Sequence, residues 1–185
     1  MGANADNALF FLVTTLFDLL LWAFLLRILL QWVRADFYNP ISQLIWQVTR
    51  YPADWLRGVI PRFRNLDMAG LLVLIVLAMI YVYILSSMLG FAVGSVALFY
   101  FALLKLAVLV ANLYTFTLFI QAILSWVGPG VNNPASNVLW SLNEPLLRPV
   151  RRIIPPMAGL DLSPLAVMLL LQVLSRLIPL PGVFR

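Results

Sequence analysis

The sequence predicts an all-α membrane protein, with four transmembrane helices arranged as two parallel repeats of helix, amphipathic segment and helix. Three observations predict this fold. Of the 185 residues, 63% are hydrophobic and 10% are charged, with a mean hydropathy of +0.99, whereas soluble domains carry about 25% charged residues. Long apolar runs occur along the chain, and the second half of the sequence repeats part of the first.

Four apolar runs are candidates for spanning helices. A helix that crosses a bilayer needs about 20 mostly apolar residues at about 1.5 Å of rise each. The runs cover residues 8–33, 68–88, 97–127 and 162–180. Between the second and the third run, the stretch LGFAVGS supplies glycines for a tight, uncharged turn.

Basic residues outside these runs predict the orientation, because short loops rich in Arg and Lys stay in the cytoplasm. Both long connections carry arginines, whereas the 89–96 turn and the residues before the first run carry none. We therefore expect both long loops to be cytoplasmic and both termini to face outward. The positive charge then indicates attraction to anionic lipid headgroups rather than binding to nucleic acid.

An internal repeat defines two domains, residues 1–94 and 95–185. The stretch QWVRADFYNPISQLIW at 31–46 recurs as SWVGPGVNNPASNVLW 94 residues later, and 13 of 42 ungapped positions are identical. Because each copy has two spans, both copies enter the membrane from the same side, related by an axis along the membrane normal. The repeated positions expected to serve as motif and interface anchors are Trp32, Asn39, Pro40, Trp46 and Asp67, and then Trp126, Asn133, Pro134, Trp140 and Asp161.

The segments 39–60 and 133–154 between the spans are patterned. Each starts with an Asn suited to cap a helix and a Pro suited to its first turn. Apolar residues then recur at helical spacing on both sides of a proline, which predicts two short amphipathic helices joined there. Such helices tend to lie in the membrane interface. A re-entrant hairpin is the alternative, and it would need protein or water around the arginines.

Two stretches carry a family resemblance. QWVRADFYNPISQ and EPLLRPVRRIIPPMAGLDLSPLAVMLLL resemble the duplicated motifs of the YggT (YlmG) family of small integral membrane proteins from bacteria and plastids. The resemblance covers nearly the whole chain. It implies the bacterial inner membrane, hence periplasmic termini, and a link to osmotic or extracytoplasmic stress or to cell division. Plastid relatives are linked to haem attachment and to nucleoid organisation, but no common biochemical activity is established for the family.

Arginines of the two long loops are expected to contact lipid or a partner. The first copy departs from the fuller family motif, because Arg57 is followed by Gly58 where the second copy has Arg151 and Arg152. The second copy is therefore the better candidate for an arginine-dependent contact. The residues expected to make it are Arg57, Arg148, Arg151 and Arg152.

The composition also argues against an enzyme. The chain has no Cys and no His, so thiolate or imidazole catalysis, Cys/His metal sites and haem attachment through Cys-x-x-Cys-His are excluded. No glycine-rich phosphate loop is present. We expect no catalytic activity, no cofactor and no metal.

Polar residues inside the spans are costly and usually functional. Asp18 aligns with Asn112 and Arg27 with Gln121 at the 94-residue shift. These side chains could line a hydrated path between the copies. Alternatively, Asn112 and Gln121 make interhelical hydrogen bonds while Arg27 extends to the cytoplasmic surface. Nine residues separate Asp18 from Arg27, which places them on opposite sides of a helix and weakens the path. Lys105 also lies within a span and needs a partner.

Asp67 and Asp161 open the second and fourth spans. A carboxylate is favourable at the positive amino terminus of a helix, and Ser163 could cap the fourth span before its proline. The alternative is a salt bridge from these aspartates to Arg57 or Arg151.

Two classes of function follow. The first is a membrane-organising or assembly factor that presents arginine-bearing helices to lipids or to a membrane-protein partner. The second is a small channel or transport component for ions or osmolytes, which forms when the chain homo-oligomerises.

Overall fold

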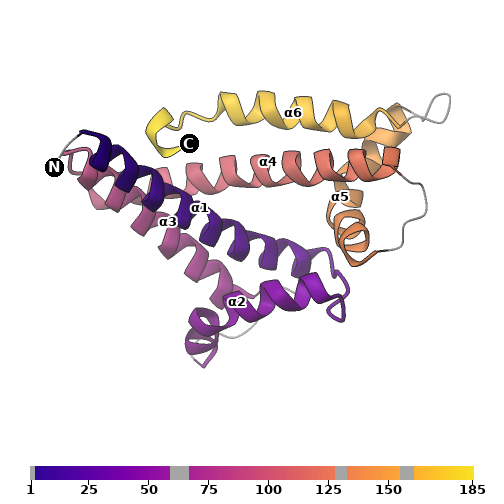
Figure 1. The fold of residues 1–185 in the computed structure, drawn as a ribbon, viewed down its shortest axis with the longest axis horizontal. Coiled ribbons are helices and arrows are strands. Elements are labelled where there is room, and N and C mark those ends of the chain that lie inside the picture. The colour runs from indigo at the N-terminus through magenta and orange to yellow at the C-terminus, as the bar shows by residue number, and fades with distance from the viewer. Residues whose placement is uncertain (1–2, 59–66, 128–132, 155–160) are drawn as a thin grey trace.

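The computed structural model describes residues 3–58, 67–127, 133–154 and 161–185 (Figure 1). Every regular element in these ranges is a helix. The elements are α1 Ala3–Trp32, α2 Pro40–Arg57, α3 Met68–Met88, α4 Ser95–Val127, α5 Pro134–Ile153, α6 Ser163–Leu177 and the short 3-10 helix η1 Gly182–Phe184.

Three helices, α1, α3 and α4, are long and apolar enough to cross a membrane. The fourth predicted span, 162–180, is only partly helical. Its helix α6 has 15 residues, which is about 22 Å of helix against a hydrocarbon core of about 30 Å. The helix ends at Leu177 because Pro179 and Pro181 follow, and a proline cannot continue a helix and disfavours helical backbone just before it.

The long helices form two side-by-side pairs, α1 with α3 and α4 with α6 (Figure 1). Both termini and the α3–α4 turn lie at one end of these pairs, and α2 and α5 lie toward the other end. The helices of the two long connections are therefore brought together at one end of the molecule.

The main apolar core lies where α1, α3 and α4 meet. Leu21 and Phe24 of α1 are fully buried there, together with Ala78 of α3 and Ala102 of α4. Alanines at this contact let the helix backbones approach closely. A second, smaller cluster where α4, α5 and α6 meet holds Leu118, Leu147 and Val167.

The predicted starts of α2 and α5 are confirmed. Asn39 precedes α2, and its side chain accepts a hydrogen bond of 3.0 Å from the Ile41 amide. Asn133 precedes α5 and accepts one of 2.7 Å from the Ser136 amide. Pro40 and Pro134 occupy the first helical turn, where a missing amide donor costs no helical hydrogen bond.

Each connecting segment is one helix, so the prediction of two short helices joined at a proline is wrong. The first, α2, has 18 residues and continues through position 52. The second, α5, has 20 residues and contains Pro145 and Pro149. These prolines are four residues apart and both exposed. Each lacks an amide donor, so the missing backbone hydrogen bonds lie on the outer side of α5. Residues 59 and 60 of the first predicted segment lie outside the described residues.

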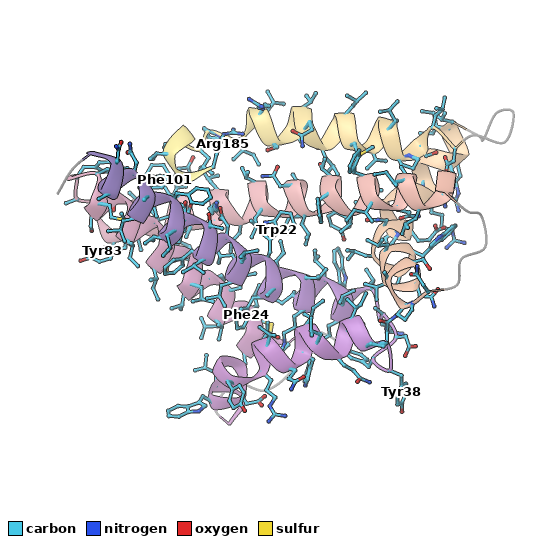
Figure 2. The ribbon with its side chains drawn as sticks, viewed as in Figure 1. Trp22, Phe24, Tyr38, Tyr83, Phe101 and Arg185 are labelled. Atoms are coloured by element: carbon cyan, nitrogen blue, oxygen red, sulfur yellow. The ribbon has the colours of Figure 1, made fainter. Side chains whose placement is uncertain are left out.

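The C-terminal tail folds back along the bundle after α6. Its Phe184 is buried, with ring centroids 5.7 Å from Phe101 and 6.4 Å from Phe91. The next residue, Arg185, donates hydrogen bonds to the carbonyl oxygens of Ser175 and Ile178, at 2.9 and 3.0 Å. The tail thus closes the end of α6 and brings a guanidinium toward α1 and α4 (Figure 2).

Candidate functional site

A buried ion pair joins the three helices of the first half. Arg27 of α1 donates hydrogen bonds of 2.9 Å to Asp67 at the start of α3 and to the hydroxyl of Thr49 in α2. Its guanidinium also lies 4.0 Å from the centroid of the Trp46 ring. The side chains of Arg27 and Asp67 are each 1% exposed. A charged pair at this depth needs these additional contacts to offset its desolvation.

The structure corrects the expected position of Arg27. Its side chain does not extend to the surface, because the Asp67 carboxylate lies within reach and would otherwise be buried without this cation. Asp67 also accepts a hydrogen bond of 3.3 Å from the Gly70 amide, so its predicted position at the start of α3 is confirmed. Arg27 forms a salt bridge with Asp67, and the Arg57 side chain lies outside the described residues.

A second ion-pair cluster joins α5 to the start of α6. Arg151 donates through Nε to Asp161 and through Nη1 to Glu144, both at 2.8 Å. The predicted alternative of an Arg151–Asp161 salt bridge is therefore present. The Arg151 guanidinium lies 5.3 Å from the Trp140 ring centroid.

Asp161 also organises the start of α6. Its Oδ1 accepts a hydrogen bond of 2.9 Å from the Ser163 amide. Partial burial would raise the pKa of Asp161, but hydrogen bonds from Ser163 and Arg151 outweigh burial and hold the pKa below its ordinary 3.8. The expectation that Ser163 caps this helix is wrong: Ser163 is already its first residue, and its hydroxyl donates to the Ile154 carbonyl at 3.4 Å.

The two clusters use matching tryptophans and aspartates but take their arginine from different helices. Trp46 and Trp140 are 94 residues apart, as are Asp67 and Asp161. The guanidinium comes from the long helix α1 in the first half and from α5 in the second. The aspartate that opens the third helix of each half is therefore held by a cation in both cases.

In the second half, uncharged polar side chains form a hydrogen-bond network at Gln121, the position that corresponds to Arg27 in the repeat. Gln121 of α4 accepts a hydrogen bond of 2.8 Å from Asn143 of α5, and the Asn143 oxygen accepts one of 2.8 Å from Thr117. All three side chains are buried. Gln121 therefore makes the expected interhelical hydrogen bond, and its partner is on α5.

The two connecting helices meet at their amino termini. The side chain of Asn39, whose oxygen caps α2, also donates a hydrogen bond of 2.7 Å through its nitrogen to the carbonyl oxygen of Pro134, the first residue of α5. Two of the predicted motif positions, one from each half of the chain, are thus in direct contact.

The surface at this end is both basic and apolar. Arg148 and Arg152 are exposed on α5, one helical turn apart, whereas Arg151 between them is engaged in its ion pairs. Trp32 and Trp140 are more than half exposed. The Trp126 side chain lies outside the described residues. Exposed apolar side chains also follow one face of α2: Leu44, Val48, Tyr51 and Trp55.

A pocket of about 320 Å³, lined by both apolar and polar side chains, lies between α1 and α4. Its walls hold Asp18 and Asn112, the polar pair predicted from the 94-residue shift. Lys105 finds its partner here, because its Nζ lies 2.7 Å from Asp18 Oδ1 and donates to the Tyr81 hydroxyl at 3.3 Å. The lining residues are Thr15, Asp18, Leu19, Trp22, Lys105, Leu109, Asn112 and Arg185.

Sequence reasoning missed several contact residues. Thr49 and Asn143 are 94 residues apart, both polar and both central in a connecting helix, so the repeat carried a signal for them. Glu144 and Tyr81 offered no comparable signal. Across the described ranges, no cluster of three acidic side chains could hold a metal ion.

These observations define a class: in the ranges that the structure describes, the protein is all-helical, with three helices of membrane-spanning length and charged side chains paired between them. The CCB3/YggT family model matches the chain twice, over residues 6–88 and 100–181. The chain belongs to this family, and the resemblance carried by its motifs is confirmed.

Similar proteins span most of the chain. The uncharacterised protein YggT of Escherichia coli K12 is 40% identical over 169 residues, which is 91% of this chain and 88% of the relative. An uncharacterised protein of Vibrio alginolyticus, named for its place in the proC 3' region, is 42% identical over 168 residues, 90% of each chain. An uncharacterised protein of Pseudomonas aeruginosa is 37% identical over 175 residues, 94% of this chain and 89% of the relative. No solved structure matches the chain.

Proposed function

We propose that this protein is a non-enzymatic organiser of the bacterial inner membrane, which presents α2 and α5 on the cytoplasmic face to anionic lipids or a membrane-protein partner. The observation that carries the proposal is the placement of the α5 arginines. Arg148 and Arg152 are exposed one turn apart, while the ion pairs of Arg151 fix the helix between them. Two exposed guanidiniums on a fixed helix suit phosphate or carboxylate groups at the membrane surface.

The proposed topology places the end with α2 and α5 in the cytoplasm. This end carries Arg34, Arg50, Arg148, Arg151 and Arg152, whereas the 89–96 turn at the opposite end has no basic residue. Both termini lie near that turn (Figure 1), as expected if the chain crosses the membrane an even number of times. In this proposal α6 and its tail complete a fourth crossing, and two copies of one unit are related by an axis along the membrane normal.

The exposed face of α2 supports an interfacial position over a re-entrant one. Its Trp55 is 90% exposed and follows Leu44, Val48 and Tyr51 along the helix. Aromatic and aliphatic side chains on one face suit the boundary between headgroups and acyl chains. An organising role at this surface would account for the stress or division phenotypes that the family resemblance implies.

The experiment measures lipid retained by the purified full-length chain. The chain is purified in the presence of either short-chain phosphatidylglycerol or phosphatidylcholine. Native mass spectrometry then measures how much of each lipid stays bound to the protein. We expect Arg148→Gln with Arg152→Gln to lower retained phosphatidylglycerol and to flatten its salt dependence. Arg176→Gln, an exposed arginine of α6, is the matched control. Equal retention by the double variant and the control would contradict lipid binding at α5.

A second candidate function is a small oligomeric transport component for ions or osmolytes. The observation that favours it is the pocket, where Asp18 and Asn112 face one space between α1 and α4. Ion flux through purified protein in liposomes, abolished by Asp18→Leu and unaffected by the α5 double variant, would establish this function in place of the first.

A further inference from the structure

The pocket is built from one face of each of two long helices. Thr15, Asp18, Leu19 and Trp22 recur at helical spacing on α1, and Lys105, Leu109 and Asn112 do so on α4. Its volume of about 320 Å³ is at the lower end of ligand pockets, which span about 300 to 1,000 Å³, and far exceeds the roughly 30 Å³ of one water. It therefore has room for a small organic group.

The two charged side chains Lys105 and Asp18 differ in how accessible they are to a ligand in the pocket. The Lys105 side chain is 3% exposed, and its Nζ contacts Asp18 at 2.7 Å and the Tyr81 hydroxyl at 3.3 Å, with the Tyr81 ring centroid at 4.4 Å. The Asp18 side chain remains 35% exposed. The lysine is thus enclosed by α1 and α3, whereas part of the carboxylate is open to an incoming donor.

The surroundings of Asp18 suit an organic cation. Trp22 lines the pocket one turn along α1, and an indole ring attracts ammonium groups through its face. Asn112 and Thr15 add oxygen acceptors. A carboxylate, an aromatic ring and neutral oxygens together match a ligand ammonium group.

Arg185 supplies the complementary charge on another wall. Its Nη2 donates to the carbonyls of Ser175 and Ile178, which hold the guanidinium at the pocket. A guanidinium has five N–H donors, so the rest of the group can bind an anion. One acidic and two basic side chains line the pocket, so their net positive charge repels a simple cation. A ligand that carries both charges can place its ammonium group at the exposed part of Asp18 and its anionic group at Arg185.

We infer that the pocket between α1 and α4 binds a zwitterion, with its ammonium group at Asp18 and Trp22 and its anionic group at Arg185. Two sources offer this chemistry: the headgroup of an aminophospholipid that enters between the helices, and a free small molecule with the same two charges. This site is independent of the proposed lipid contact at α5, because it requires both charges in one ligand.

Three probes separate the sources. Dihexanoyl phosphatidylethanolamine carries both charges on two short chains, glycerophosphoethanolamine carries the same two charges without chains, and dihexanoylglycerol has the chains without charge. Each is titrated into the purified full-length chain in neutral detergent by isothermal titration calorimetry. The Arg148→Gln, Arg152→Gln background removes the proposed phosphate contact at α5.

Two further changes test the location. Asp18→Asn should weaken binding about tenfold or more, and Leu19→Trp should do so by filling the pocket without altering the Asp18–Lys105 pair. Leu19 lines the pocket and is mostly exposed, so the larger ring should not disturb the core. Asp36→Asn, at an exposed position before α2, is the control, and circular dichroism verifies helix content for each variant.

Saturable binding of dihexanoyl phosphatidylethanolamine alone would identify a lipid, and binding of glycerophosphoethanolamine as well would identify the free zwitterion as sufficient. The inference fails if dihexanoylglycerol binds equally, if neither charged probe saturates, or if binding survives both Asp18→Asn and Leu19→Trp. None of these outcomes depends on phosphatidylglycerol retention, so failure here leaves the α5 proposal intact.

Discussion

The guanidinium of Arg27 and the carboxylate of Asp67 form a buried ion pair of 2.9 Å across forty residues of sequence. The pair joins the long helix α1 to the first turn of α3, and Thr49 attaches it to α2. One side chain thereby fixes all three helices of the first half.

Removing one partner of this pair should be strongly destabilising. We expect Arg27→Leu to lower the free energy of unfolding by about 3 to 5 kcal/mol, because a buried ion pair loses one of its two charges. The measurement is thermal unfolding in detergent. Arg176→Gln, at an exposed position, should change stability by less than about 0.5 kcal/mol. The double variant Arg27→Leu, Asp67→Leu should be less damaged than Arg27→Leu alone; an additive loss would show that the two charges are not coupled.

Asn39 should be less tolerant of substitution than Asn133. The side-chain oxygens of both residues cap a helix, and the side-chain nitrogen of Asn39 also donates a hydrogen bond to the Pro134 carbonyl oxygen. Asn39→Asp keeps the cap acceptor and removes that donor, so we expect a loss of about 1 to 3 kcal/mol. Asn133→Asp keeps its cap and should be nearly neutral. Equal thermal shifts for the two variants would argue against a stabilising contact between α2 and α5.

The Arg151–Asp161 contact should make stability depend on pH. The pKa of Asp161 in the folded protein lies below its ordinary 3.8, so the carboxylate contributes stability that is present above that value and is lost as pH falls through the folded pKa. In thermal unfolding from about pH 6 to about pH 3, the wild-type chain should lose more stability than Asp161→Asn. Parallel curves for the two proteins would disprove this contribution.

Neighbouring arginines of α5 should have separable effects. Arg151→Gln breaks contacts to Asp161 and Glu144 and should lower the unfolding temperature. Arg152→Gln changes an exposed side chain and should leave that temperature unchanged while reducing phosphatidylglycerol retention. Both readings come from one preparation of each variant, and loss of stability in Arg152→Gln would show that its role is structural.

Features that depend on short spacing could be predicted from the sequence. The starts of α2 and α5 followed from Asn39-Pro40 and Asn133-Pro134, because capping is decided within three residues of the chain. The long helices α1, α3 and α4 followed from apolar length. The end of α6 was predicted three residues too late because the apolar run was counted through Pro179, which helical backbone does not accommodate.

The apolar runs and motifs of this sequence by themselves determined a helical protein with long apolar helices, the starts of α2 and α5 and the family to which the chain belongs. Four spans were predicted, and three helices in the described ranges have membrane-spanning length. Only the tertiary structure decided which charges meet. Asp18 pairs with Lys105, 87 residues away, and Arg27 turns inward to Asp67 instead of outward to the surface. The periodicity of a helix determines on which face a side chain lies. Its partner, however, comes from the helix that packs against that face. A charge buried there without a partner would cost too much free energy, so the charges pair.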